Sequence, residues 1–226
     1  MISYISTVFG CQLAYTIRKL ERTLNYSALS QFLTYAYTID GQTLFKNIFE
    51  LLPGQKLVYY FDEKKPHISN YWNLTLQNSS DSEDIILKKL EKLLTKSIDL
   101  RLESDAPVGA LLSGGLDSSI MVAILNNITD TPVKTFTTGF GHELDEYNEA
   151  KIVAEHCGTD HNEIELSYKK LTDSLPTILW HMEFPFGRPS ILSNFLVSEE
   201  VKKFVTVAYT GEGSDELFGG YNRYIP

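Results

Sequence analysis

The stretch Val108-Gly-Ala-Leu-Leu-Ser-Gly-Gly-Leu-Asp-Ser-Ser119 joins a short apolar run to a polar turn that contains two glycines. The continuously apolar run 108–112 predicts a strand covered on both faces, as in a parallel sheet. A helix is expected to follow directly, from Ser118 to Asn126. The end of a strand, where a glycine turn leads into a helix, is a place where α/β sheets bind phosphate groups.

The same alternation of short apolar runs and helical periodicity continues on both sides of this stretch. It predicts a doubly wound α/β domain with a mostly parallel sheet. Pro176 is expected to interrupt or kink the helix in which it lies. The further strands are expected at 133–138, 163–166 and 205–209, and the further helices at 86–102, 146–157, 168–182 and 195–204.

The first part of the chain has a different pattern. After a helical stretch, residues 56–61 and 67–72 predict a β-hairpin with its turn at 62–65. The polar stretch 77–83 has no apolar anchor, so a domain boundary is expected there. The predicted domains are residues 1–78, a β-rich module, and residues 79–226, the α/β domain.

Composition excludes several classes of function. The chain has 226 residues and a formal net charge of -9, which argues against a nucleic-acid partner. No apolar run is long enough to cross a membrane, so no membrane partner is expected. The two cysteines and five histidines have no metal-ligand spacing, and a reducing cytoplasm is the expected compartment.

The residue types of the central turn suit a phosphate group held together with a metal ion. Gly114 and Gly115 let the backbone approach an anion closely, while the hydroxyls of Ser113, Ser118 and Ser119 can donate hydrogen bonds to it. Asp117 would repel a bare phosphate but can hold Mg²⁺ that bridges it to the phosphates. An ordinary glycine turn with a helix cap needs only one or two of these residue types.

A second motif, Thr210-Gly-Glu-Gly-Ser-Asp-Glu-Leu-Phe-Gly-Gly-Tyr221, also follows an apolar run. Because parallel strands end at one edge of a sheet, two such loops can share a crevice. Glu212 is a candidate for proton transfer and Asp215 for a second magnesium ligand. Alone, an acidic glycine-rich loop is as often a solvated turn.

These motifs carry a family resemblance. Residues 113–119 resemble the SGGxDSS pyrophosphate loop of the N-type ATP pyrophosphatases, and no GK[ST] of a Walker loop is present. With residues 210–221 they strongly resemble the glutamine-hydrolysing asparagine synthetase family, with Thr210 in place of serine. The segments Phe140–Ala150, Val153–His161 and Glu183–Ser190 are also similar to that family's patterns.

The resemblance implies an adenine nucleotide alpha hydrolase-like fold, preceded by a remnant of an Ntn-type glutaminase domain. It implies ATP and Mg²⁺ as cofactors, aspartate and ammonia as substrates, Asp117 and Asp215 as metal ligands, and Glu212 as the residue that handles the proton of ammonia. A homodimer or a companion glutaminase chain is expected. The nucleotide-binding positions implied are Leu112, Ser113, Gly114, Gly115, Asp117, Ser118, Ser119, Thr138, Thr210 and Gly211; Thr138 reads equally well as an ordinary strand residue.

The chain also departs from that pattern. The family's glutaminase nucleophile is an N-terminal cysteine, whereas this chain has Ile2, and Cys11 is expected to be a buried structural thiol. Relatives continue beyond the second motif, so a fragment truncated at both ends is expected. Three alternatives therefore stay open: a sibling amidotransferase (β-lactam synthetase, lasso-peptide cyclase or sugar-modifying type), another ATP pyrophosphatase such as GMP synthetase, and a non-catalytic fragment that binds a nucleotide or a partner.

Overall fold

The computed structural model describes residues 4–6 (backbone only), 23–102, 106–143, 145–182, 187 and 190–224 (backbone only at residue 223). The chain divides into two compact units. The first contains residues 1–79 and 175–191, and the second contains residues 80–174 and 192–226. The assignment of residues 1–78 as a glutaminase remnant and 79–226 as a synthetase domain stays a prediction.

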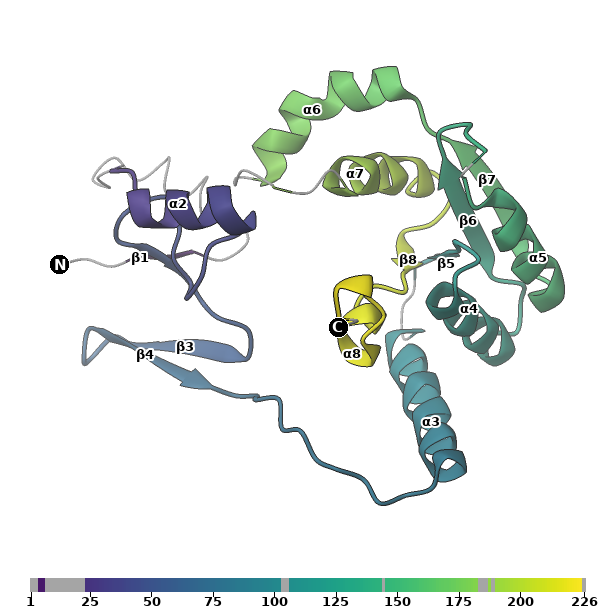
Figure 1. The fold of residues 1–226 in the computed structure, drawn as a ribbon, viewed down its shortest axis with the longest axis horizontal. Coiled ribbons are helices and arrows are strands. Elements are labelled where there is room, and N and C mark those ends of the chain that lie inside the picture. Colours follow the sequence, from purple (N-terminus) through teal and green to yellow (C-terminus); the bar gives the residue numbers. More distant parts are fainter. Residues whose placement is uncertain are drawn as a thin grey trace. The chain divides into compact units, whose positions relative to one another are not determined.

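The second unit is built on a four-stranded sheet with the order β7-β6-β5-β8 (Figure 1). Every neighbouring pair in it is parallel. The predicted α/β fold with a parallel sheet is therefore confirmed. Its strands are β5 (Val108–Leu111), β6 (Lys134–Gly139), β7 (Asp160–Glu165) and β8 (Val207–Tyr209).

Helices cover both faces of this sheet. Successive strand residues point to opposite sides, so neighbouring residues of β5 pack against different helices. Ala110 belongs to one buried cluster, together with side chains of α3, α4 and α5. Leu111 packs against the other cluster, which α7 and the start of α6 supply. The helices are α3 (Glu83–Leu102), α4 (Leu116–Ile128), α5 (Tyr147–Cys157), α6 (Tyr168–Met182), α7 (Ser190–Val201) and α8 (Ser214–Phe218), with a 3-10 turn η1 (Asn222–Tyr224).

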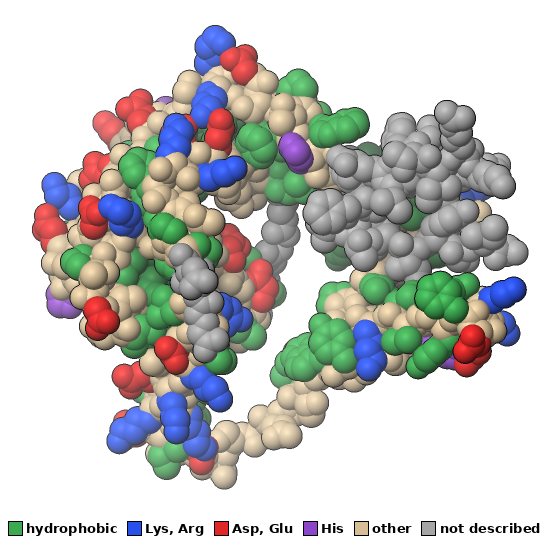
Figure 2. Space-filling view, turned by 180° about the vertical axis from the view of Figure 1, so that it is seen from behind, with side chains coloured by type: hydrophobic (Ala, Val, Ile, Leu, Met, Phe, Trp, Pro, Cys, Tyr) green, Lys and Arg blue, Asp and Glu red, His purple; other side chains and the backbone are tan. Residues whose placement is uncertain are grey.

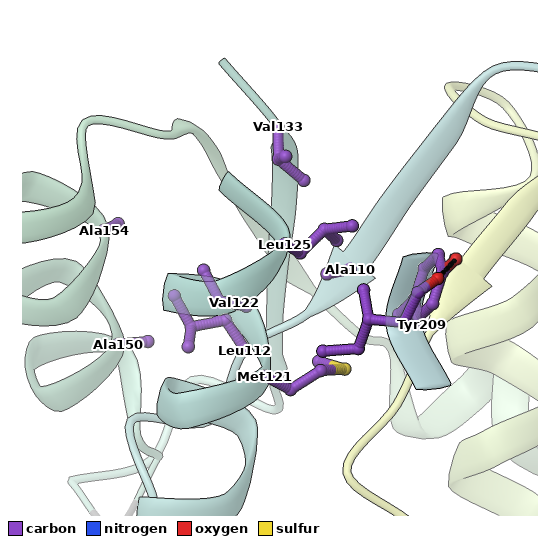
Figure 3. Packing of buried hydrophobic residues seen from close by; sticks show 10 residues of the cluster. Ala110, Leu112, Met121, Val122, Leu125, Val133, Ala150, Ala154 and Tyr209 are labelled. Carbon is purple, nitrogen blue, oxygen red and sulfur yellow. Dashed lines mark hydrogen bonds between the residues drawn. The ribbon is translucent and has the colours of Figure 1, made fainter. Parts of the chain in front are cut away.

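The first of these clusters ties α4 to the centre of the sheet. Figure 3 shows Met121 of α4 beside Tyr209 and Leu125 beside Ala110. Val122 of the same helix belongs to the same buried cluster. Val122, Leu125 and Ala110 are completely buried. Tyr209 adds a link to α3, since its hydroxyl donates to the carbonyl oxygen of Ile98 over 3.1 Å. The start of α4 is thereby fixed relative to the ends of β5 and β8.

Pro176 does not interrupt α6, which is one helix from Tyr168 to Met182. The expected interruption is therefore wrong, while the alternative expectation, a kink at Pro176, stays a prediction. Proline lacks an N–H and its ring crowds the carbonyl of residue i−4, but a helix can continue past it with one backbone hydrogen bond fewer. Within the part of the chain that the structure describes, no helix combines the length and the apolar character needed to span a membrane.

The first unit contains the predicted hairpin. Strands β3 (Gln55–Tyr60) and β4 (Lys65–Asn70) pair antiparallel, and their register joins Leu57 to Ile68. The helix α2 (Tyr26–Tyr35) and the parallel strands β1 (Tyr4–Ser6) and β2 (Ile48–Glu50) complete its described elements. Charged side chains of both signs are interspersed on the visible face in Figure 2.

A chain of polar side chains links β6 to β7 inside the second unit. The hydroxyl of Thr135 lies 2.9 Å from that of Thr159 and 3.0 Å from Nδ1 of His161. Nε2 of His161 is buried and has no hydrogen-bond partner among the described residues. Burial lowers the pKa of His161 below 6.5; Glu163 opposes this shift and Lys151 reinforces it.

The lowered pKa predicts acid sensitivity. Between the pKa of folded His161 and 6.5, the unfolded chain binds more protons than the folded chain, so the free energy of unfolding falls as the pH falls through this range. Replacing His161 by Gln should remove this part of the loss. Urea unfolding from about pH 7.5 to about pH 5 measures it. Equal losses in the wild type and in His161→Gln would contradict the prediction.

Candidate active site

The glycine turn between β5 and α4 is closely packed against the start of α5. Gly114 has φ = +77°, in the left-handed region that disfavours side chains. A Cβ atom built there would lie 2.5 Å from the carbonyl carbon of Glu149 and 2.6 Å from the nitrogen of Ala150. Both its conformation and its surroundings therefore require glycine at position 114.

Serine side chains hold the rest of the turn in shape. The Ser118 hydroxyl accepts from the Ser113 N–H over 3.2 Å and lies 3.0 Å from the Ser113 hydroxyl. The Ser113 hydroxyl in turn accepts from the Gly115 N–H over 3.2 Å. The Ser119 hydroxyl donates to the Gly115 carbonyl over 2.7 Å. The turn is thus ordered by its own side chains before any ligand binds.

The first turn of α4 is open to an anion. Its N-cap residue is Gly115, and no side chain caps the helix there. The N–H groups at a helix start point outward along the axis and carry partial positive charge, which favours a bound anion. Asp117 lies in this first turn with an exposed side chain.

The second motif meets the first because β8 pairs directly with β5. A Cβ atom at Gly211 would lie 3.3 Å from the nitrogen of Ser118 and 3.4 Å from Cβ of Asp117, so the two loops are in contact. Helix α8 then carries Asp215 and Glu216 in its first turn. The Tyr221 hydroxyl donates to the Glu216 carboxylate over 2.6 Å.

A cavity of about 650 Å³ lies between these loops and the ends of β5 and β6. Residues of α7 line it from a third side: Ser193, Asn194, Val197 and Ser198. All its described lining residues belong to the second unit. This volume is in the range of small-molecule binding sites.

The cavity is strongly acidic. Among its described lining residues there is no Lys, Arg or His, and there are six carboxylates: Asp117, Asp145, Glu146, Glu212, Asp215 and Glu216. Such a surface repels a polyphosphate unless cations come with it. One or two carboxylates combined with phosphate oxygens and water is the ligand set that Mg²⁺ prefers. No group of three or more acidic, His or Cys side chains that could hold a metal ion by itself occurs among the described residues.

Most of the sequence-predicted site residues line this one cavity. They are Leu112, Ser113, Asp117, Ser118, Thr138, Thr210, Gly211, Glu212 and Asp215. The cavity is not lined by Gly114, Gly115 or Ser119. These residues contribute to the shape of the turn itself. The roles given to these residues remain proposals.

Other lining residues were not singled out from the sequence. The Asp145 carboxylate accepts from the N–H groups of Phe140, over 2.9 Å, and of His142, over 2.8 Å, and so orders the loop after β6. Asp145 and Glu146 lie in the segment Phe140–Ala150, and its resemblance to the family pattern could have identified them as candidate site residues. Nothing in the sequence of α7 identified its polar side chains in the same way. Cys11, Ile2 and most of the Glu183–Ser190 segment lie outside the described residues.

Comparison with known proteins shows to which family the chain that forms this cavity belongs. The family model described as asparagine synthase matches residues 89–226, which include both loops and every described residue that lines the cavity. The chain belongs to the asparagine synthase family. Its match covers more than half of the sequence.

Individual relatives agree with the family assignment. The chain is 32% identical to a putative glutamine-hydrolysing asparagine synthetase 2 of Methanocaldococcus jannaschii, over 91% of this chain and 40% of that protein. It is 32% identical to the glutamine-hydrolysing asparagine synthetase 1 of Bacillus subtilis, over 89% of this chain and 32% of that protein. The chain thus spans well under half the length of these relatives.

More distant similarities extend beyond asparagine synthetases. Amidase chyE of Penicillium rubens is 30% identical over 84% of this chain and 31% of that protein. Among solved structures, an NH3-dependent NAD synthetase from Campylobacter jejuni matches with a TM-score of 0.41 and 15% identity, over 62% of this chain and 61% of that one.

Proposed function

We propose that this chain carries the adenylating site of a glutamine-dependent asparagine synthetase. In this reaction ATP activates the side-chain carboxylate of aspartate, and ammonia then converts the activated acid to the amide. The contact between the loop 113–119 and the loop 210–213, both lining one acidic cavity, is the observation that carries the proposal.

The first loop suits the leaving group of the adenylation. The N–H groups at the start of α4 and the hydroxyls around Ser113 would receive the phosphates of ATP. Asp117 and Asp215, which both line the cavity, would hold Mg²⁺, which neutralises phosphate charge when bound. The backbone of Leu112, Thr138 and Gly211 would receive the rest of the nucleotide.

The chemistry then consists of two displacements. A carboxylate oxygen of aspartate forms a bond to the α-phosphorus, and the bond between that phosphorus and the departing pyrophosphate breaks. Hydrogen-bond donors fixed at the helix start stabilise the charge of the leaving pyrophosphate. Ammonia next forms a bond to the acyl carbon, AMP leaves with its oxygen, and Glu212 takes a proton from the nitrogen.

The two steps predict a separation in the variant Glu212→Gln. With Mg²⁺, the protein should exchange labelled pyrophosphate into ATP only when aspartate is present. Glu212→Gln should keep this exchange within about threefold but lose roughly a hundredfold in amide formation from ammonia, because general base catalysis commonly contributes that much. Exchange and asparagine are measured on the same samples.

Each outcome of this experiment has a distinct meaning. No exchange from folded protein would refute an autonomous adenylating site and favour a non-catalytic relative. Exchange with another carboxylic acid instead of aspartate would favour a sibling enzyme; the similarity to a protein named an amidase makes such acids necessary controls. Equal loss of both activities in Glu212→Gln would refute the role given to Glu212.

A further inference from the structure

One peptide unit at the end of β5 is held on both sides by side-chain hydroxyls. The carbonyl oxygen of Leu112 accepts from the hydroxyl of Thr137 over 2.5 Å. The N–H of Ser113, which belongs to the same peptide plane, donates to the hydroxyl of Ser118 over 3.2 Å. Since a peptide is planar, fixing its two polar ends fixes its rotation about the chain.

This unit lies where the sheet ladder ends. The Leu112 N–H still donates to the Phe136 carbonyl on the neighbouring strand over 2.9 Å. Beyond it the chain leaves the sheet into the glycine turn. Among the described residues, the Thr137 hydroxyl is the donor to the Leu112 carbonyl. A side chain thus extends the hydrogen bonding between β5 and β6 by one bond beyond the strand backbones. Thr137 is 3% exposed and Leu112 is 2% exposed, so water does not replace this bond easily.

We propose that Thr137 is a positioning residue for the phosphate-binding turn. Through the Leu112 carbonyl it sets the direction in which the chain enters residues 113–119, and so the placement of the Ser113 N–H and hydroxyl. Thr137 also lines the cavity, but in this role its hydroxyl acts through the Leu112 carbonyl and needs no contact with a ligand. Its relevance to ATP rests on the proposed function, whereas its effect on the turn does not.

The alternative is that the Thr137 hydroxyl only forms a hydrogen bond required by its burial and has no effect on the turn. Another threonine of β6 serves as a matched control for this alternative. Thr135 lies two residues earlier on the same strand, is completely buried and also makes hydroxyl hydrogen bonds. Its partners are Thr159 and His161, on the side of β7 and away from the turn. Thr135→Val and Thr137→Val thus remove equivalent groups, and only the second lies beside the turn.

Amide hydrogen exchange in the ligand-free protein tests the effect on the turn. In Thr137→Val the Ser113 amide should exchange roughly five- to tenfold faster, which is the effect of about one net hydrogen bond. Thr137→Ser keeps the hydroxyl and should exchange like the wild type, and Thr135→Val should leave Ser113 unchanged. If Thr137→Val unfolds, Thr137→Ala against Thr137→Ser makes the same comparison. An unchanged Ser113 amide in the variants without the hydroxyl would overturn the proposal.

Titration with ATP and Mg²⁺ tests the functional consequence. The dissociation constant should rise roughly five- to tenfold in Thr137→Val, recover in Thr137→Ser and stay within about twofold in Thr135→Val. If the wild type does not bind ATP while the Ser113 amide still responds to Thr137→Val, the proposed function fails and the positioning role stands. Equal weakening by Thr135→Val and Thr137→Val would reduce Thr137 to a core residue.

Discussion

Replacing Asp117 by Asn is expected to lower aspartate-dependent pyrophosphate exchange roughly a thousandfold, which corresponds to about 4 kcal/mol of lost transition-state stabilisation. The substitution keeps the size of the side chain and removes its charge. Asp117 lies in the first turn of α4, where the cavity meets the second loop. No lysine, arginine or histidine occurs among the described residues that line the cavity. Under the proposed function, Mg²⁺ would supply positive charge to the phosphates, and Asp117 would help to hold it.

The control for this variant is Asp130→Asn, a change of the same kind at an exposed residue that does not line the cavity. It should keep exchange within about twofold, as surface substitutions usually do. Asp117→Asn should also need more Mg²⁺ to reach half of its residual rate. If Asp117→Asn exchanged pyrophosphate as fast as the wild type at limiting Mg²⁺, Asp117 would hold no metal ion.

The second large effect is on stability, in Gly114→Ala. We expect the free energy of unfolding to fall by about 3 kcal/mol, combining the cost of a left-handed backbone for a non-glycine residue with that of steric overlap. A new Cβ would lie 2.5 Å from backbone and side-chain carbons of Glu149, and backbone atoms cannot rotate away. Urea unfolding monitored by circular dichroism measures the loss.

Gly158→Ala separates the two causes. Gly158 also has a positive φ, +71°, but no atom lies within 4 Å of a Cβ built there. This variant should therefore lose only about 1 kcal/mol, the conformational part. If both variants lose the same amount, the turn moves away from α5 easily and the close packing at Gly114 has little energetic weight.

The sequence was sufficient to predict the sheet and the two loops, for a physical reason. Strands β5 and β6 are largely buried, and apart from Lys134 and the glycines their residues are apolar or β-branched. Gly114 is required by a positive φ that few other residues adopt. Because parallel strands end at one edge, the meeting of both loops also followed from the pattern.

What could not be predicted depends on contacts between elements distant in sequence. The hydrogen bond from Thr137 to Leu112 joins residues 25 positions apart, and neither residue type predicts it. The polar side chains of α7 reach the cavity only through the packing of that helix. Residues 175–191 group with the first unit although they follow the sheet's third strand in the chain, and no shift in composition marks that change.

The pairing of β5 with β8 has a consequence for the order in which this molecule can acquire its cavity. The register joins Val108 to Val207, so the central strand β5 and its outer neighbour β8 are separated by almost half of these 226 residues. Such non-local pairings form slowly, because a long loop must close before the contact gives any stabilisation. On the ribosome, residues 108–119 emerge long before residues 207–221. The acidic loop therefore joins the serine turn only after β8 has been synthesised, and no intermediate that lacks β8 has a complete site.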